Sequence, residues 1–486
     1  MPRLAGTPRR RPFALSAIVA VLIAGVVAFA PTAAFAQTSG WPAPNLQAVF
    51  PLGGQPGKEV EVSVAGTDLD DAKLVFSNPA IVSEPLTADP KPYQTARPVI
   101  ANRFKVTIPA DCPPGLYDVR TVGRFGASNP RSFVVDPAPD ALEVEPNNET
   151  VQAQEIPLGG VVNGKTESRG FDYFKFHAKA GQRVLIELWA DRLDTRLDGT
   201  LVLLDAAGRE LASSRDAAGL DPFIDFTAPA DGDYLVRLYD FVYQGGDNYA
   251  YRLAIGTGPR IDFVMPPLAP KDQPGAVVIY GRNLPGSQPA SGVSVDGRPL
   301  EMLSRPLQAS GADLAGASPD AFLAPGLFVD PARVSVGAFE FRLTTPAGVS
   351  NPVAIETTTA PIVLEKEPNN LATQAQPLTV PCEVGGQFYP VNDQDVYAFE
   401  AKKGDVLWIE VAAQRLGLAV DPLLVVQRAV KSAEGVESFQ DVTTADDPAA
   451  APQGTIIESG DDPSVLFTAP EDGSYRILVR DLYSRL

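Results

Sequence analysis

Four short stretches decide the fold class, because each alternates apolar with polar residues. They read VEVSV at 60–64, FKVTI at 104–108, YFKFH at 173–177 and YLVRL at 234–238. Period-two alternation with β-branched and aromatic residues is typical of strands that are buried on one face. The chain has 41 glycines and 47 prolines in 486 residues, and no long segment keeps a helical apolar period. The sequence therefore predicts an all-β fold of tandem β-sandwiches.

Internal repetition gives the domain plan. The stretch LEVEPNN at 142–148 returns as LEKEPNN at 364–370, and FTAPADGDY at 226–234 returns as FTAPEDGSY at 467–475. Between these motifs, DYFKF at 172–176 matches DVYAF at 395–399. The regions that precede each copy also echo one another, since SNP at 128–130 recurs at 350–352. Self-similarity in a constant order predicts two copies of one two-domain unit.

The repeated motifs resemble the bacterial pre-peptidase C-terminal (PPC) domain, a jelly-roll-like sandwich that accompanies many secreted peptidases. The regions before them resemble immunoglobulin-like sandwiches of the IPT/TIG type, with an opening GKEVEV strand at 57–62 and a closing SNP strand. These resemblances imply four domains behind a signal peptide. The predicted bounds are 1–36 for the signal peptide, 41–138 and 259–358 for the Ig-like domains, of which the second is degenerate, and 141–257 and 362–486 for the PPC-like domains.

The N-terminus predicts export. A basic head that ends at Arg11 precedes an uncharged run over 13–30, and AFA at 34–36 offers small residues to a signal peptidase. We therefore predict a cleaved signal peptide, a secreted or periplasmic mature chain and no membrane association after cleavage. An uncleaved anchor is the alternative, since the apolar run is just long enough to span a bilayer. The sequence RRPF at 10–13 leaves twin-arginine and Sec export both open.

Charge and cysteine content narrow the class of partner. The formal net charge is −19, and removal of a signal peptide with four arginines and no acidic residue makes it −23. Such an acidic chain repels the phosphate backbones of nucleic acids. Nucleic acid is therefore not expected as a partner. The two cysteines, Cys112 and Cys382, lie in different halves and cannot form a disulfide framework. Stability is therefore expected to come from apolar cores.

Catalytic machinery is not evident in the sequence. The one histidine, His177, alternates outward from a strand and is replaced by Glu400 in the second copy. The sequence contains no HExxH, no GxSxG elbow and no Walker loop. PPC domains are not themselves known as catalysts, so we predict a non-enzyme. Acid–base work by a pair of carboxylates stays open as an alternative.

The acidic strip at 143–148 and its repeat carry the best chemical signal. Calcium takes six to eight oxygen ligands from carboxylates, amides and carbonyls, and residues two apart lie on one side of an extended segment. Collagen-binding domains of clostridial collagenases, which are of the same general type, hold calcium with a comparable strip. We therefore predict structural calcium in each copy. The predicted ligands are Glu143, Glu145, Asn147, Asn148 and Asp172 in the first copy, and Glu365, Glu367, Asn369, Asn370, Asp393 and Asp395 in the second.

Two details qualify this site. The first copy has Arg169 and Gly170 where the second has Asn392 and Asp393, which favours the second copy as the better ligand set. The alternative interpretation is that Pro-Asn-Asn is a turn whose side chains bond local backbone groups.

Two other groups were weighed for a binding role. The acidic pairs Asp216/Asp221 and Asp461/Asp462 precede the repeated FTAP motif, and we predict that they belong to solvated loops. The tyrosines at 239, 243 and 249 either form a ligand face or belong to the core and to strand pairing, and the sequence leaves both open.

The two copies differ at their ends. The stretch YAYRLAI at 249–255 predicts a closing strand in the first copy, with four large side chains on one face that cover an edge of the core. The second copy has no counterpart before Leu486. We therefore expect the chain to be a fragment, or its last domain to have an open edge.

Two functions follow from these patterns. The first is a non-catalytic secreted protein whose sandwiches are spacers or binding modules for an extracellular polymer, a glycan or another secreted protein. The second is the N-terminal accessory region of a secreted hydrolase, most simply a peptidase. Neither the ligand nor the oligomeric state follows from the sequence.

Overall fold

Strands make up almost all the regular structure of this chain. The computed structural model describes residues 41–483, except 94–95, 218–219, 272, 296, 308–336, 419 and 447–461. Within these residues the only helices are short 3-10 turns, so the predicted all-β fold is confirmed. The predicted signal peptide and Asp461 lie outside the described residues. No helix in the described part is long and apolar enough to cross a membrane.

The first domain is built from two facing sheets around a core that includes Leu46, Val106 and Phe133. One sheet has the order β1 (Asn45–Phe50), β3 (Glu59–Thr67), β6 (Val99–Thr107) and β5 (Val82–Thr87). The other has the order β2 (Gly53–Gly54), β9 (Arg131–Val135), β7 (Gly115–Gly123) and β4 (Lys73–Phe76), with β8 (Gly126–Ala127) paired to β7. Alternate residues of β3 and β6 face this core, which explains the sequence pattern.

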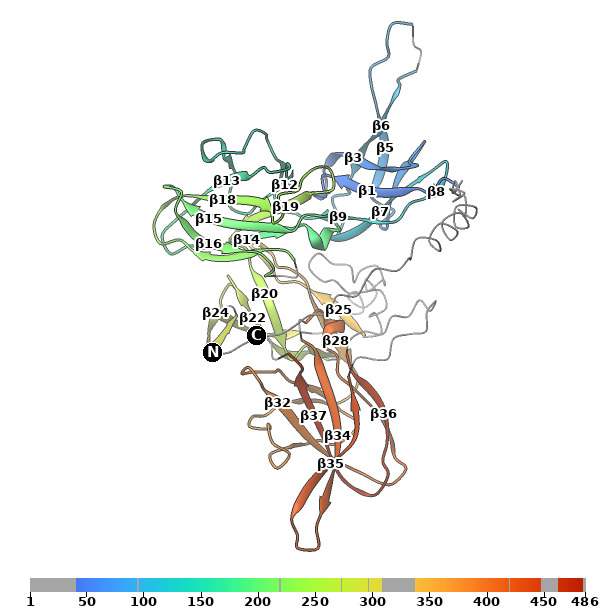
Figure 1. Cartoon of the computed structure of the whole chain (residues 1–486), viewed down its shortest axis with the longest axis vertical. Helices are drawn as coiled ribbons and strands as arrows, with labels where there is room; N and C mark the ends of the chain where they lie inside the picture. The colour runs from blue at the N-terminus through green and yellow to red at the C-terminus, as the bar shows by residue number, and fades with distance from the viewer. Residues whose placement is uncertain are drawn as a thin grey trace, which may run out of the picture. The chain divides into compact units, whose positions relative to one another are not determined.

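The next domain, residues 140–256, is called the first repeat. Its inner sheet has the order β10 (Asp140–Leu142), β12 (Gly160–Lys165), β19 (Ala250–Gly256), β14 (Arg183–Trp189) and β17 (Phe223–Thr227). Its outer sheet has the order β11 (Gln154–Glu155), β13 (Asp172–Ala178), β18 (Gly232–Asp240), β15 (Gly199–Asp205) and β16 (Glu210–Ser214). β13, β18, β15 and β16 are among the green strands in Figure 1, which also include strands of the inner sheet. A fully buried core, with Phe174, Phe176 and Leu253 at its centre, fills the space between the sheets.

The third domain has a smaller core that includes Ile279 and Ile355. One sheet has the order β20 (Arg260–Met265), β22 (Gly275–Arg282), β24 (Arg298–Leu307) and β23 (Gln288–Val295). The second has the order β21 (Leu268–Pro270), β28 (Val353–Thr358) and β25 (Ala338–Phe341), beside the hairpin of β26 (Thr344–Thr345) and β27 (Gly348–Val349). Whether this domain and the first are of the immunoglobulin type stays a prediction.

The last domain, residues 362–483, is called the second repeat. Its outer sheet has the order β30 (Gln376–Pro377), β32 (Gln394–Ala401), β37 (Gly473–Asp481), β34 (Pro422–Lys431) and β35 (Glu437–Ala445); β32, β37, β34 and β35 are orange to red in Figure 1. This order matches the outer sheet of the first repeat strand for strand. Two short sheets remain, β29 (Ile362–Leu364) with β31 (Glu383–Gly385), and β33 (Val406–Glu410) with β36 (Ser464–Thr468).

Local details support the alignment of the two repeats. Arg169 and Asn392, which the sequence aligns, have positive φ values of 63° and 64°. The hydroxyl of Tyr234 donates to the carbonyl of Ala230 at 2.7 Å, and Tyr475 donates to Glu471 at 2.6 Å in the same way. Aligned positions therefore make the same turns in both repeats.

The repeats differ at β19. We expected this strand to cover an edge of the sandwich, and that expectation is wrong: β19 is an inner strand that pairs antiparallel with β12 on one side and β14 on the other. In the described part of the second repeat no strand stands between β31 and β33, the counterparts of β12 and β14. The burial of the core residues beside this place differs as well. Val184 and Ile186 on β14 are fully buried, whereas their counterparts Leu407 and Ile409 on β33 are only partly buried.

We predict that the second repeat unfolds locally before the first. Four side chains of the closing segment at 249–255 pack on the core of the first repeat and have no counterpart in the described part of the second, and burying each such side chain is worth about 1.5–3 kcal/mol. That sum is comparable to the whole stability of a domain, about 5–15 kcal/mol. Limited proteolysis followed by mass spectrometry should cut within 362–483 first and leave 140–256 intact. Equal resistance of the two repeats would contradict the prediction.

Candidate metal centre

The acidic strip of the first repeat folds into one cluster with a residue from the outer sheet. Carboxylate oxygens of Glu143, Glu145 and Asp172 all lie within 4.8 Å of one another. Glu143 follows β10, and its backbone N–H donates to the carbonyl of Asn163 at 2.9 Å. Asp172 is the first residue of β13 and is fully buried. Three like charges so close together repel one another unless protons or a cation intervene.

Several oxygens of this cluster lack a hydrogen-bond donor. Oδ1 of Asn147, Oδ1 of Asn148 and Oδ1 of Asp172 are buried and accept no hydrogen bond in the described structure. The amide nitrogen of Asn147 is used, because it donates to Oε1 of Glu143 at 2.9 Å. A buried oxygen without a donor is costly, so such atoms indicate a missing partner. Together with the carboxylates of Glu143 and Glu145, they form an all-oxygen set that suits a hard cation.

Tyr251 belongs to this cluster, and the sequence analysis missed it. Its hydroxyl lies 2.6 Å from Oε1 of Glu143 and 3.0 Å from Oδ2 of Asp172. One hydroxyl proton serves only one of these oxygens at a time. Tyr251 therefore does not neutralise the pair. In the sequence, only the alternation within 249–255 indicated that Tyr251 points inward. In the structure its ring lies beside that of Phe174.

The second repeat brings the corresponding residues together. Carboxylate oxygens of Glu365, Glu367 and Asp395 lie within 4.8 Å of one another. Oδ1 of Asn369 and Oδ1 of Asp395 are buried without a donor in the described structure. The Asn369 amide donates to Oε1 of Glu365 at 3.2 Å, as Asn147 does in the first repeat. The two clusters are thus built from aligned carboxylates and an aligned asparagine.

Asp393, which we predicted as a ligand, lies outside the trio of the second repeat. It accepts the side-chain amide of Asn370 at 2.8 Å and the backbone N–H groups of Tyr389 and Gln394 at 3.0 Å each. The side chain of Asn370 is therefore held by Asp393. In the first repeat Gly170 stands at this position, and Oδ1 of Asn148 has no donor. In the described structure the first repeat thus has two buried amide oxygens without a donor, Oδ1 of Asn147 and of Asn148, and the second has one, Oδ1 of Asn369.

A tyrosine hydroxyl reaches the same spot in both repeats from different strands. A Cβ on Gly164 would lie 2.4 Å from the hydroxyl oxygen of Tyr251 and 2.6 Å from Oε2 of Glu143. A Cβ on Gly386, the matching glycine, would lie 3.1 Å from the hydroxyl of Tyr397 and 3.1 Å from Oε2 of Glu365. Tyr397 lies on β32, at the position of Phe174. A tyrosine hydroxyl therefore lies near the aligned glycine in both repeats, from β19 in the first and from β32 in the second.

The electrostatics of both clusters reflect crowding of negative charge. Burial, the carboxylate of Glu143 and the other acids of the first cluster raise the pKa of Asp172 to about 8. Burial and the carboxyl of Glu365 raise the pKa of Asp395 to about 9. Burial also raises the pKa of Glu143, against hydrogen bonds from Tyr251 and Lys165. At neutral pH these sites hold their full charge only if a cation joins them.

Solvent reaches the first cluster through an open depression. Its walls include the acidic strip, the loop after Lys165 and the glycine turn before Asp247. Nζ of Lys165 lies 2.7 Å from Asp247 and 4.4 Å from the ring centre of Phe50. The lysine is therefore directed toward Asp247, and Glu143 and Glu145 line the depression while Asp172 lies buried behind them.

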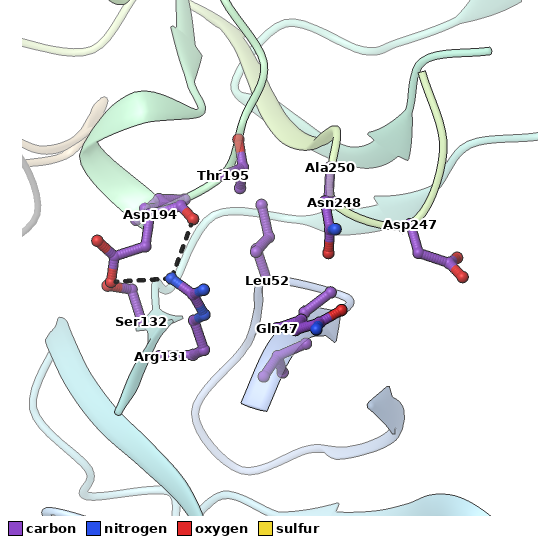
Figure 2. A pocket seen from close by; sticks show the side chains of 12 residues that line it. Gln47, Leu52, Arg131, Ser132, Asp194, Thr195, Asp247, Asn248 and Ala250 are labelled. Carbon is purple, nitrogen blue, oxygen red and sulfur yellow. Dashed lines mark hydrogen bonds and ion pairs between the residues drawn. The ribbon is translucent and has the colours of Figure 1, made fainter. Parts of the chain in front are cut away.

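A separate small pocket lies near the junction of the first domain and the first repeat (Figure 2). Arg131 donates to the carbonyl of Asp194 at 3.3 Å, and its guanidinium lies 3.9 Å from the carboxylate of that residue. The other labelled residues, which include Leu52 and Asn248, offer neither clustered acids nor a nucleophile–base pair. This pocket therefore suits packing rather than chemistry.

The prediction of a solvated loop is wrong for Asp221 and for Asp462. Asp221 is fully buried and accepts backbone N–H groups of Ala190, Asp191 and Arg192, besides the Arg192 guanidinium at 2.7 Å. Asp462 accepts the same set from residues 413–415, with the Arg415 guanidinium at 2.9 Å. Each aspartate caps a 3-10 turn of the same shape. Asp216 is exposed, as predicted.

The remaining candidates do not form a second site. His177 is exposed and contacts Asp233 at 2.9 Å, which fits the predicted surface role. Tyr249 packs against the apolar core. Tyr239 and Tyr243 stack at 5.4 Å, beside Phe171, on the outer face of the first repeat.

The family model for the bacterial pre-peptidase C-terminal domain matches residues 170–240. The chain carries one such PPC domain. The match begins after the acidic strip, so the strip itself lies outside it.

Known proteins resemble part of this chain. A probable subtilase-type serine protease of Deinococcus radiodurans is 37% identical over 100 residues, which are 19% of this chain and 14% of that protein. The chain thus spans a small part of the curated relative that it matches. The PPC domain of a Bacillus anthracis collagenase is 20% identical, with a TM-score of 0.18, over 21% of this chain and 93% of that domain. A periplasmic inhibitor of g-type lysozyme from Aeromonas hydrophila is 14% identical, with a TM-score of 0.17, over 24% and 97% of the two chains.

We predict that Asp221→Ala destabilises the first repeat by about 2–4 kcal/mol. The change removes a buried acceptor of three backbone N–H groups and leaves part of the Arg192 guanidinium without its counter-charge. Denaturant unfolding of the purified protein measures this loss. Asp216→Ala, an exposed aspartate in the same loop, is the control and should change stability by less than about 0.5 kcal/mol. A similar small effect of both changes would contradict the capping role.

Proposed function

We propose that this protein is a non-catalytic extracellular module whose repeats are stabilised by a bound cation, with calcium as the best fit. The donor-free oxygens beside converging carboxylates support this proposal most directly. In the first repeat the ion would be held by Glu143, Glu145, Asn147, Asn148 and Asp172. In the second it would be held by Glu365, Glu367, Asn369 and Asp395. Asp393 and Asn370 would orient the loop beside the ion.

Oxygen-only ligands of mixed type favour calcium over softer metals. Zinc sites use cysteine and histidine, and neither residue type belongs to these clusters. Magnesium demands near-ideal octahedral geometry and usually keeps several waters, whereas calcium accepts irregular sets of six to eight oxygens. The ion would neutralise the carboxylates and tie the strip before β12 to the start of β13, which joins the two sheets of a repeat at one end.

The rest of the molecule supports a spacer or binding role. His177 is exposed and has only Asp233 as a close partner, so it lacks a nucleophile to activate. The strongly negative chain suits partners such as an extracellular polymer, a glycan or a secreted protein rather than nucleic acid. Export to the periplasm or the medium belongs to the same proposal.

A second function is favoured by one observation. The curated relative matched by this chain is a probable serine protease, and PPC domains occur in secreted peptidases. The chain would then be the accessory region of a secreted hydrolase. The coding sequence downstream of Leu486 tests this directly: a hydrolase domain there would favour the second function, and further EPNN repeats would favour the first.

Calcium should raise the melting temperature of both repeats. At a hundredfold excess over Kd, a ligand that binds only the folded state adds about 2.7 kcal/mol. Calorimetry in EDTA and in millimolar calcium, with magnesium as the comparison ion, measures the shift. Unchanged transitions for both repeats would contradict the proposed site.

Single variants separate an ion site from a simple turn. Asp395→Asn removes one of three converging charges, so in EDTA it should stabilise the second repeat while abolishing its calcium shift. Glu367→Gln should likewise remove most of the shift. Glu400→Gln, an exposed acid on the same strand as Asp395, is the control and should leave the shift intact. If the motif is only a turn, none of these variants will change the response to calcium.

Hydrolytic activity is not expected of this chain. The purified protein should show no turnover of casein, gelatin or a p-nitrophenyl ester. Reproducible turnover that is abolished by a point mutation within residues 41–483 would overturn the non-enzyme proposal.

A further inference from the structure

A short 3-10 turn of the first repeat, η2 (Asp191–Leu193), lies against the first domain. Leu193, its last residue, is 2% exposed and packs with Leu52 and Val134 of that domain. Leu193 does not belong to the apolar core between the two sheets of its own repeat. Its burial therefore depends on the contact between the two domains.

Other contacts on this side fit the two domains closely together. Arg131 of the first domain donates to the carbonyl of Asp194, the residue after η2, at 3.3 Å. A Cβ on Gly53 would lie 2.4 Å from the carbonyl oxygen of Val134 and 2.6 Å from Nη1 of Arg252 on β19. The first domain thus meets the first repeat without room for a side chain at position 53.

The same turn is linked to the third domain through charged groups. Arg192 of η2 pairs with Glu187 on β14 at 3.0 Å, and Glu187 pairs with Arg260 on β20 at 2.9 Å. The guanidinium of Arg260 also lies 4.3 Å from the ring centre of Phe223. Burial favours the neutral form of Glu187, but the guanidiniums of Arg260 and Arg192 outweigh it and lower its pKa to about 2. Glu187 therefore stays charged and bridges η2 to the third domain.

A second group of ion pairs supports the contact with the third domain. Arg183 on β14 binds Asp225 of its own repeat at 2.8 Å and 2.5 Å, and it binds Glu301 of the third domain at 3.0 Å. Arg282 of the third domain lies 2.8 Å from Asp225 and is 3% exposed. Removing one partner of such a pair is costly, because it leaves the other charge buried and unpaired.

The shape of η2 is not fixed by its own sequence. Its N-cap residue, Ala190, makes no side-chain hydrogen bond to the turn. Asp221, about 30 residues later, accepts the backbone N–H groups at the start of the turn and the guanidinium of Arg192. Asp221 thus positions both Leu193 and Arg192, and through them it holds the contacts with both neighbouring domains.

The second repeat makes the same kind of contact. Its 3-10 turn η5 (Gln414–Leu416) is capped by Asp462 in the same way. Leu416 is 4% exposed and packs with Ala338 and Ala354 of the third domain, which precedes this repeat. Recurrence at the aligned turn of both repeats indicates that this docking belongs to the two-domain unit rather than to one loop.

We infer that η2, held by Asp221, is a joint that fixes the first and third domains on the first repeat, so that these three domains move and unfold as one body. Only residues 136–139 and 257–259 connect their sheets along the chain. Domains joined by such segments alone would reorient freely. The inference rests on the spacer role proposed above and makes that spacer rigid. It does not involve the cation, because the joint and the acidic strip use different residues.

Native-state hydrogen exchange on the purified full chain tests the joint. The amides of β9, β14 and β22 report on the first domain, the first repeat and the third domain in turn. With rising denaturant these three sets should exchange through one unfolding event, with one common dependence on denaturant concentration. The measurement is made in EDTA and repeated in millimolar calcium, so that any response to the cation is read separately.

Variants at the joint should separate one domain at a time. Leu193→Asp should make the amides of β9 exchange at least about tenfold faster than those of β14 and β22, as expected for the loss of one buried leucine contact. Arg260→Met should have this effect on β22 alone. Asp221→Ala should separate both neighbours from the first repeat.

Matched controls make similar changes at exposed positions of the first repeat. Val151→Asp, at a side chain that is 87% exposed, and Arg209→Met, at an exposed arginine that pairs with Asp205, should leave the three sets exchanging together. If Leu193→Asp does not fold, as judged from exchange in β13, Leu193→Ala takes its place with the same expected direction.

Two results would overturn the inference. One is exchange of the three sets of wild-type amides through separate events with different dependences on denaturant. The other is that both the Leu193 variant and Arg260→Met leave the three sets exchanging together. Either result would leave the cation site standing, whereas a single unfolding event without any calcium response would count against the cation site alone.

Discussion

Sheet continuity is the constraint on which the rest of this structure depends. An inner strand of a sandwich needs a neighbour on each side, because its backbone groups and its core-facing side chains are both removed from water. The first repeat meets this condition through β19, which joins β12 to β14 and brings Leu253 and Ile255 over the core. In the described part of the second repeat the outer sheet has the same strand order, and the other strands form two separate pairs.

The acidic cluster lies at one end of the same sheets. Repulsion between its carboxylates is the second constraint on the structure. Its carboxylates converge because Glu143 leaves β10 while Asp172 begins β13, so two elements far apart in the chain meet at one end of the sandwich. The backbone alone thus fixes the separation of the charges. Neutralising these charges would help to hold the two sheets together, and we therefore propose a structural role for a cation at this place.

Much of the fold was predictable from local patterns, and the reasons are physical. Period-two alternation fixed which residues of 60–64 and 173–177 face a core, and the repeated motifs fixed the order of the domains. Glu143, Glu145 and Asp172 could be grouped because residue type and spacing restrict what they can do. Tyr251 could not be added to this group, because its contact with the cluster depends on the pairing of β19 with β12. These strands lie about 90 residues apart in the sequence, and pairing over such a distance leaves no local pattern.

Burial of polar residues was the other limit of the sequence analysis. Asp221 and Asp462 look like solvated acids in Gly/Pro-rich loops, yet each is buried against three backbone N–H groups and an arginine. The turn that they cap is separated from them by about 30 residues in one repeat and about 48 in the other. Only their recurrence at the same place before FTAP, in both repeats, could have indicated a structural role.

The second repeat shows how one sequence pattern can keep a site while changing its surroundings. Tyr397 stands at the position of Phe174 and brings a hydroxyl close to Gly386, the glycine that matches Gly164 beside the Tyr251 hydroxyl in the first repeat. At the same time Val161 becomes Glu383 and Val134 becomes Glu356, which converts an apolar contact beside β19 into an acidic one.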